Sequence, residues 1–182
     1  MTDAKLTAMV EQLWDREAIR DCIYRYCRAV DRRDEALLRS IYWPEANDYH
    51  GAFNGQADAF VTYVMAFIAT QELIQHSIGT INIQLEGAKA KVESYFTGYQ
   101  RFPNMDGVMT DFFMGGRYLD KMEKRDGEWR TADRFVVYDW FREMPGSFDY
   151  VSGAFGFVPV TGAQDEQDKL YSWLGVARGA GV

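Results

Sequence analysis

The sequence predicts an α+β domain in which helices come first and a curved antiparallel sheet follows, forming a cone with an open mouth. Three observations support this class. Apolar residues recur at helical spacing over the first third of the chain. Apolar and polar residues then alternate over long segments that are separated by short turns. Glycines, which often mark a bulge or bend inside a strand, interrupt these segments at Gly79, Gly98, Gly115 and Gly116. Helices gathered on one face of such a sheet give an α+β domain.

Three helices are expected before the sheet. The first covers about residues 8–33, where charged residues separate the apolar positions. Asp34 is a suitable N-cap for a short second helix at 35–42, and we expect Pro44 to end it. The elements that follow are an extended piece rich in turn residues at 47–55 and a third helix at 57–70.

Four long antiparallel strands are expected at 75–85, 89–102, 108–124 and 128–144. Residues 1–145 are therefore predicted to form the cone domain. The Gly-rich tail, 146–182, is irregular except for a short helix near 165–173, and we expect it to close the pocket or to pack on an oligomer.

Composition narrows the function. The chain of 182 residues is long enough for one domain, and its 12 Phe, 11 Tyr and 5 Trp can line a cavity as well as fill a core. A net charge of −7 argues against a nucleic acid partner. No segment offers the roughly 20 apolar residues that span a bilayer, and the charged N-terminal segment has no apolar signal core, so we expect a cytoplasmic protein without a membrane partner.

Sequence motifs that indicate a bound cofactor or a known catalytic nucleophile are not found. The sequence has no Walker loop, dinucleotide fingerprint, nucleophile elbow or zinc signature. Cys22 and Cys27 lie in an apolar helical setting, which supports neither a disulfide nor a nucleophile. We therefore expect chemistry by His, Asp, Tyr and Arg side chains, with no cofactor and no metal.

His76 is the most informative of these residues. It opens the first long strand, and it alternates in phase with Asn82 and Gln84, so the three side chains are expected on one polar face of the strand. If that face lines the cavity, His76 lies at the edge of the cavity, where it could accept a proton. Asp31 ends the first helix, where an acid opposes the helix dipole, and it could bond the far nitrogen of His76. The alternatives are a histidine bonded to a loop and a solvated acid paired with neighbouring arginines.

Arg134 lies among aromatic residues of the last strand, and a charge there needs a partner. It could face a leaving group or a developing oxyanion. The alternative is a buried ion pair with Asp133, Asp139 or Asp111.

Three further polar side chains could reach the cavity. Tyr24 and Tyr26 of the first helix are candidates for the core, although a phenol that reached the cavity could donate a proton. His50 alternates with Asp48 on one face of the extended piece, so we expect it at the surface or at the mouth of the cavity.

Three motifs carry a family resemblance: IRDCIYRYCRAVDRRDEALLRSIYWPEA, QHSIGTINIQLEGAKAKVESY and GGRYLDKMEKRDGEWRTADRFVVYDWF. In this order and spacing they resemble the SnoaL-like branch of the nuclear-transport-factor-two-like superfamily, over about residues 10–142. The resemblance implies a base at His76, its aspartate at Asp31, and pocket side chains at Arg134 and Tyr26. Scytalone dehydratase, a member, has a second histidine where this chain reads TGYQRF, so Tyr99 or Arg101 would have to substitute.

The resemblance implies a cofactor-independent lyase that carries out a dehydratase-like elimination on a small apolar, aromatic or polycyclic hydroxylated substrate. We expect substrate contacts from Tyr24, His50, Asn82, Tyr99 and Trp140, and a homotrimer or homodimer. Isomerisation, retro-aldol cleavage, binding without catalysis, and a role as the small subunit of a ring-hydroxylating oxygenase remain as alternatives.

Overall fold

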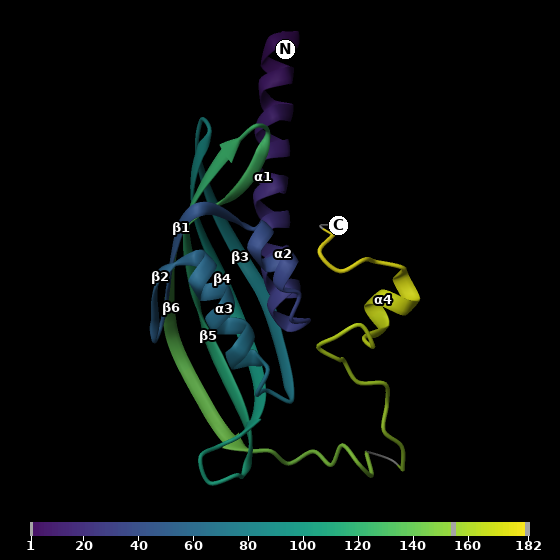
Figure 1. Cartoon of the computed structure of the whole chain (residues 1–182). Coiled ribbons are helices and arrows are strands. Elements are labelled where there is room, and N and C mark those ends of the chain that lie inside the picture. The colour runs from purple at the N-terminus through teal and green to yellow at the C-terminus, as the bar shows by residue number, and fades with distance from the viewer. Residues whose placement is uncertain (1, 154–155, 181–182) are drawn as a thin grey trace.

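A computed structural model of the chain describes residues 2–153 and 156–180. Helices precede the long strands and a loosely structured tail follows them, as the sequence predicts (Figure 1). The elements in order are α1 (Asp3–Asp31), α2 (Glu35–Ser40), β1 (Tyr42–His50), β2 (Phe53–Gln56), α3 (Ala57–Ile68), β3 (Leu73–Glu86), β4 (Lys89–Pro103), β5 (Met109–Arg125), β6 (Glu128–Pro145) and α4 (Lys169–Leu174).

The strands form one six-stranded sheet in the order β2-β1-β6-β5-β4-β3. The four long strands pair as an antiparallel meander, as expected. The extended piece after α2 is a hairpin, β1–β2, that joins the sheet because β1 pairs in parallel with β6. Pro44 therefore lies within β1, and α2 ends earlier, at Ser40, with Ile41 as its C-cap. The sequence alone did not show this long-range parallel pairing.

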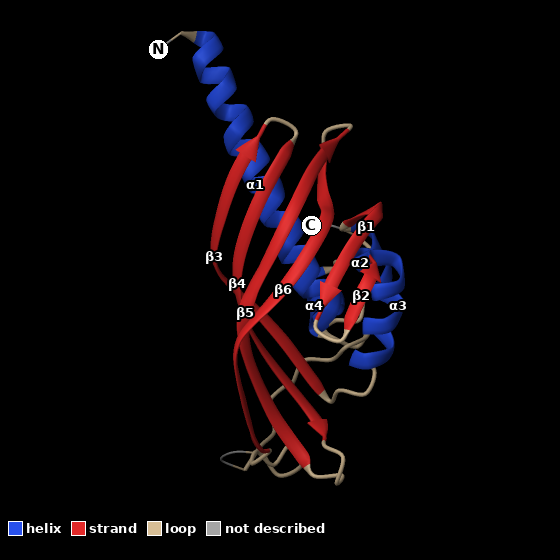
Figure 2. Ribbon diagram, turned by 90° about the vertical axis from the view of Figure 1, so that its left-hand side faces the viewer, coloured by secondary structure: helices blue, strands red, loops and turns tan. Residues whose placement is uncertain are grey.

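The sheet curves strongly around the helices (Figure 2). The pairing of β5 with β6 shifts register between Gly115 and Gly116. A Cβ on Gly116 would lie 2.1 Å from the carbonyl oxygen of Val137, and one on Gly115 would lie 2.3 Å from the ring of Trp140. Only glycine permits this close approach of the two strands, so the predicted role of these glycines in bending the sheet is supported by the contacts.

A second bulge changes which face each residue of β3 presents. The pairing of β3 with β4 shifts register between Ile78 and Ile81. Side chains alternate across a strand, so an extra residue reverses the parity beyond it. His76 consequently shares the inner face with Ile81 and Ile83, whereas Asn82 is exposed. This corrects the sequence-based expectation that His76 and Asn82 would share one polar face.

Helix α1 crosses the concave face of the sheet with its C-terminal half, which supplies core residues such as Ile19, Ile23 and Val30. Its N-terminal half extends beyond the sheet (Figures 1 and 2). Within the described residues, no helix combines the length and the apolar character needed to cross a membrane.

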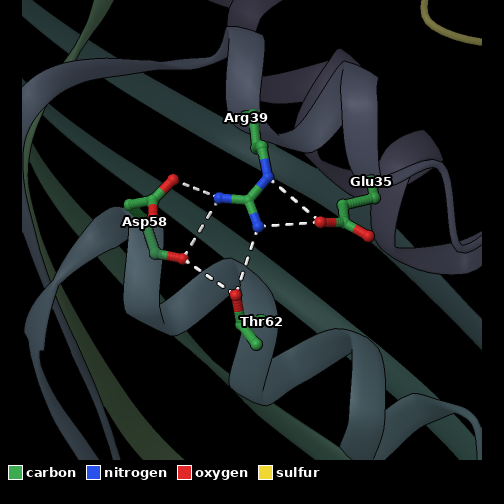
Figure 3. Close-up of polar contacts among 4 residues, drawn as sticks. All are labelled: Glu35, Arg39, Asp58 and Thr62. Carbon is green, nitrogen blue, oxygen red and sulfur yellow. Dashed lines mark hydrogen bonds and ion pairs between the residues drawn. The ribbon is translucent and has the colours of Figure 1, made fainter.

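Helices α2 and α3 are joined by a polar cluster around Arg39 (Figure 3). The guanidinium donates to Glu35 on its own helix at 2.7 and 3.1 Å and to Thr62 on α3 at 3.1 Å, and it also pairs with Asp58. This cluster ties the N-terminal part of α3 to α2.

The tail returns to the end of α1. Arg32 pairs with Asp168 at 3.3 Å, and the backbone N–H of Gly179 donates to Asp34 at 2.7 Å. Asp34 also accepts from the Leu37 N–H, so it is the N-cap predicted for α2. The tail is thus anchored at the junction of α1 and α2.

Candidate active site

His76 and Asp31 meet at the inner face of the sheet. The imidazole Nδ1 lies 2.6 Å from one carboxylate oxygen of Asp31, and the backbone N–H of His76 donates to the other oxygen at 2.9 Å. A carboxylate only accepts, so Nδ1 carries the proton of this bond and Nε2 remains for a ligand. Only 8% of the His76 side chain and 11% of the Asp31 side chain is exposed to solvent.

Local structure explains why these two residues meet. Asp31 is the last residue of α1, so its carboxylate is free to reach β3, and the two N–H donors offset the unfavourable position at the helix C-terminus. His76 pairs with Gly98 of β4, and a Cβ on Gly98 would lie 3.5 Å from the imidazole Cδ2. The ring therefore packs beside a residue without a side chain.

The imidazole of His76 faces a cavity of about 280 Å³ between the sheet, α1 and α3. Most of its wall is aromatic or aliphatic, with a few polar groups, the arrangement typical of small-molecule sites. The lining residues are Tyr26, Val30, His50, Gly51, Ala52, Phe60, Tyr63, Val64, Phe67, Ile68, Ile74, His76, Phe96, Gln100, Phe112, Met114, Tyr118, Tyr138 and Phe141.

Tyr26 reaches this cavity, and Arg134 lies beneath it. The ring of Tyr26 meets Tyr118 edge to face at 5.3 Å, and burial raises the pKa of Tyr26 well above its usual value, so its phenol stays protonated. The Arg134 guanidinium lies 4.1 Å from the Tyr26 ring centre and 4.4 Å from that of Tyr118. It donates twice to Asp120, at 2.7 and 2.8 Å, and both side chains are fully buried.

Arg134 is absent from the described lining of the cavity, so it supports the aromatic wall from behind. This arrangement matches the buried ion pair kept open as an alternative, with Asp120 as its partner in place of Asp133, Asp139 or Asp111. Asp120 faces inward on β5 and directly opposes Arg134 in the β5–β6 register.

His50 lines the same cavity from β1, near the opposite edge of the sheet. Its Nδ1 lies 3.2 Å from Asp48, and the other oxygen of Asp48 accepts a 2.7 Å bond from the hydroxyl of Tyr42. The imidazole stacks on Phe60 at 4.8 Å. His50 therefore lies at the cavity, one of the two positions expected from sequence.

Four residues expected to contact substrate lie elsewhere. Tyr24 is 47% exposed on the outer side of α1, because it lies two residues from Tyr26 and so on a different face of the helix. Asn82 bonds Glu93 on the outer face of the sheet. Tyr99 donates to Asp111 at 2.9 Å, beside the tail. Trp140 covers Gly115 on the outer face.

Several lining residues escaped the sequence analysis. Gln100 and Phe96 lie two residues on either side of Gly98 in β4, so their side chains point to the same face of the sheet as His76. The alternation of the strand would have indicated this once Gly98 was known to pair with His76. Tyr138 and Phe141 are three residues apart, so a regular strand would place them on opposite faces. Both face inward because β6 has a bulge opposite the Gly115–Gly116 pair, and no local sequence pattern predicts this bulge.

Three other features of the described residues bear on alternative chemistry. Burial raises the pKa of Cys22 to about 11 and that of Cys27 to about 12, so both thiols are protonated at neutral pH. No described group of three His, Cys, Asp or Glu side chains is arranged to hold a metal ion. A larger, open depression of about 760 Å³ near Arg16 is lined by no described histidine or tyrosine.

Comparison with known proteins agrees with this architecture. The subunit beta 2 of the terminal oxygenase component of terephthalate 1,2-dioxygenase from Comamonas is 29% identical over 127 residues, covering 69% of this chain and 76% of the relative. The gamma-hexachlorocyclohexane dehydrochlorinase of Sphingobium indicum is 26% identical over 141 residues, covering 75% and 88%. The crystal structure of a type 2 hexachlorocyclohexane dehydrochlorinase superposes with a TM-score of 0.68 at 18% identity, covering 76% and 94%.

The family assignment rests on a match of residues 11–134 to the SnoaL-like domain, a span that includes most of α1, the hairpin, most of the sheet and both residues of the His76–Asp31 pair. Helices in a curved, open sheet are the cone-shaped α+β architecture that the sequence predicts. The chain belongs to the SnoaL-like domain family.

Proposed function

We propose that this protein is a cofactor-independent lyase that eliminates a leaving group from a small, apolar, hydroxylated substrate, in the manner of a dehydratase. One observation carries the proposal: the imidazole of His76 faces a mostly apolar cavity while Asp31 holds its far nitrogen at 2.6 Å. A neutral imidazole in that position is suited to remove a proton from carbon at neutral pH.

In this mechanism Nε2 of His76 takes a proton from a carbon acidified by a neighbouring carbonyl, phenol or ring. Asp31 acts through His76 as a positioning residue, because it fixes the tautomer and stabilises the imidazolium that forms. The electron pair of the broken C–H bond forms the new double bond, and the leaving group departs from the adjacent carbon. Tyr26 supplies a protonated phenol that can assist this departure.

The shape and lining of the cavity favour an aromatic or polycyclic substrate. Phe96, Tyr118 and Tyr138 offer ring faces and edges. A volume of about 280 Å³ suits one or two rings in this conformation. We assign Arg134 to orienting Tyr26 and Tyr118, since the guanidinium is fully buried beneath both rings.

The aldol adduct of acetone and para-nitrobenzaldehyde tests the proposal, because its products are chemically distinct. Elimination gives the conjugated enone and water, retro-aldol cleavage gives para-nitrobenzaldehyde and acetone, and isomerisation leaves the mass unchanged. We expect enone formation by the parent protein, and a loss of kcat of about 10²–10⁴-fold in His76→Gln. Asp31→Asn should lose rate and alter the acidic limb of the pH profile, which a purely structural residue would leave in place.

Retention of full turnover by His76→Gln would refute the assigned base. Formation of the aldehyde in place of the enone would support the rival lyase reaction, retro-aldol cleavage, at the same site. Folding of each variant is checked by its urea midpoint, so that loss of rate and loss of structure are told apart.

A second candidate function is that of an oxygenase small subunit. The relative from Comamonas, a beta subunit of a terminal oxygenase component, favours it. Such a subunit needs no base in a cavity, so turnover of the aldol adduct by the isolated protein argues for the enzyme. Binding of the adduct without turnover argues for a carrier.

We also propose that the protein is a homodimer or homotrimer that packs through the outer face of the sheet. Exposed apolar side chains on that face support this, among them Tyr95, Leu119, Phe135 and Trp140. Light scattering of the purified chain measures the oligomer, and Phe135→Glu is expected to lower its mass.

A further inference from the structure

The chain contains only two histidines, and both line the same cavity. Each has an aspartate within hydrogen-bond distance of Nδ1: Asp31 for His76 and Asp48 for His50. In each pair this leaves Nε2 as the nitrogen available to a ligand. A single base accounts for one of the two pairs, and the second pair has no role in the mechanism above.

The two imidazoles approach the cavity from different parts of the sheet. His76 comes from β3, at one edge of the sheet, and His50 ends β1, near the other edge. Between them Phe96 and Tyr118 stack at 4.4 Å; His76 lies 6.4 Å from Phe96 and His50 lies 6.5 Å from Tyr118, centre to centre. Neighbouring rings thus run in the order His76, Phe96, Tyr118 and His50, and a substrate held against this series has an imidazole at each end of it.

Charged side chains are buried beneath His50. Asp48 is fully buried, and its strand position directly opposes that of Arg134 on β6. Arg134 is already paired with the buried carboxylate of Asp120. The described charged groups of this cluster are thus two carboxylates and one guanidinium, and the carboxylate of Asp48 is the one that lies against His50 Nδ1.

We propose that His50, held by Asp48 and Tyr42, is the general acid that protonates the leaving group. This inference rests on the proposed elimination. As Nε2 of His76 takes the proton from carbon and the double bond forms, the C–O bond breaks. The departing oxygen then takes the proton from Nε2 of His50 and leaves as water. The cycle ends with His76 protonated and His50 neutral, and solvent returns the two protonation states to the start.

The groups that face His50 come from several elements. Asp48 of β1 lies against Nδ1 and accepts a bond from the hydroxyl of Tyr42, while Phe60 of α3 stacks on the ring. The remaining titratable or charged neighbours of this cluster are Tyr26, Tyr63, Tyr118, Asp120, Arg134 and Tyr138. Burial raises the pKa values of three tyrosines of the cavity wall, Tyr26, Tyr118 and Tyr138. Their phenols therefore stay neutral over the pH range in which a histidine titrates.

Two substrates that differ only in the leaving group test the proposal: the aldol adduct above, and its acetate ester. Hydroxide needs a proton to depart, whereas acetate leaves as a stable anion. We expect His50→Gln to lower kcat on the alcohol by about 10²–10⁴-fold and to leave the rate on the acetate near that of the parent. It should also remove the alkaline limb of the pH profile for the alcohol. Asp48→Asn should act in the same direction.

The control variant is Tyr49→Phe. Tyr49 neighbours His50 in β1 but points to the outer face of the sheet, where it stacks on Phe135 at 5.9 Å. It should change neither rate. Retained turnover of the acetate by His50→Gln also shows that this variant is folded.

The outcomes separate the two proposals. Equal loss on both substrates, or no loss on either, would overturn the role of His50, while a large loss in His76→Gln would still uphold the elimination. If the parent turns over neither substrate, the elimination itself is overturned, and the role of His50 with it.

Discussion

Removal of the Arg134 guanidinium is expected to lower the free energy of unfolding. Catalytic turnover is expected to fall only as a consequence of the weakened fold. The side chain is fully buried, makes two bonds to Asp120 at 2.7 and 2.8 Å, and lies against two aromatic rings. Arg134→Met would leave Asp120 as an unpaired buried charge, which costs about 3–5 kcal/mol. With a typical urea m-value of about 1–3 kcal/mol/M, 4 kcal/mol moves the unfolding midpoint by roughly 2 M.

The double variant Arg134→Met/Asp120→Leu tests whether the unpaired charge of Asp120 causes the loss of stability. Replacing both charges by apolar groups of similar volume is often neutral or stabilising, so we expect it to recover most of the lost stability. Urea unfolding monitored by tryptophan fluorescence measures all members of the cycle. A single variant with the stability of the parent and no turnover would refute this reasoning, because it would show that the guanidinium acts on substrate and not on the aromatic wall.

Three other changes probe the fold. Gly116→Ala should cost at least about 1–3 kcal/mol because its Cβ would lie 2.1 Å from a backbone oxygen, whereas Gly79→Ala, with its nearest atom at 3.8 Å, should cost little; urea midpoints compare the two. Burial raises the pKa values of Cys22 and Cys27 above those of the unfolded chain, so stability should be full below about pH 9 and fall as the pH rises toward 11. The C22A/C27A variant should flatten that fall by up to about 1.4 kcal/mol per pH unit for each thiol, and an unchanged slope would contradict the shifts. Asp34→Ala should cost about 1–2 kcal/mol by removing the N-cap of α2, and it should also speed proteolysis of the tail, which loses its bond to Asp34.

The elements with strong local patterns were predictable from the sequence. The helical spacing of α1, the capping by Asp34 and the alternation in the four long strands are local signals, and the structure confirms each of them within a few residues. The β1–β2 hairpin was not recognised as part of the sheet, because its parallel pairing with β6 joins segments about 85 residues apart. No local pattern encodes such a partner.

The candidate site divides in the same way. The sequence by itself singled out His76 and Asp31, because an acid at a helix end and a lone histidine at a strand start each call for a partner. Only the tertiary structure decided which face of β3 His76 occupies, since one bulge reverses the parity of every residue beyond it. It also decided that Arg134 lies behind the wall and that His50 faces the cavity, because burial and pairing across strands depend on contacts that no single segment contains.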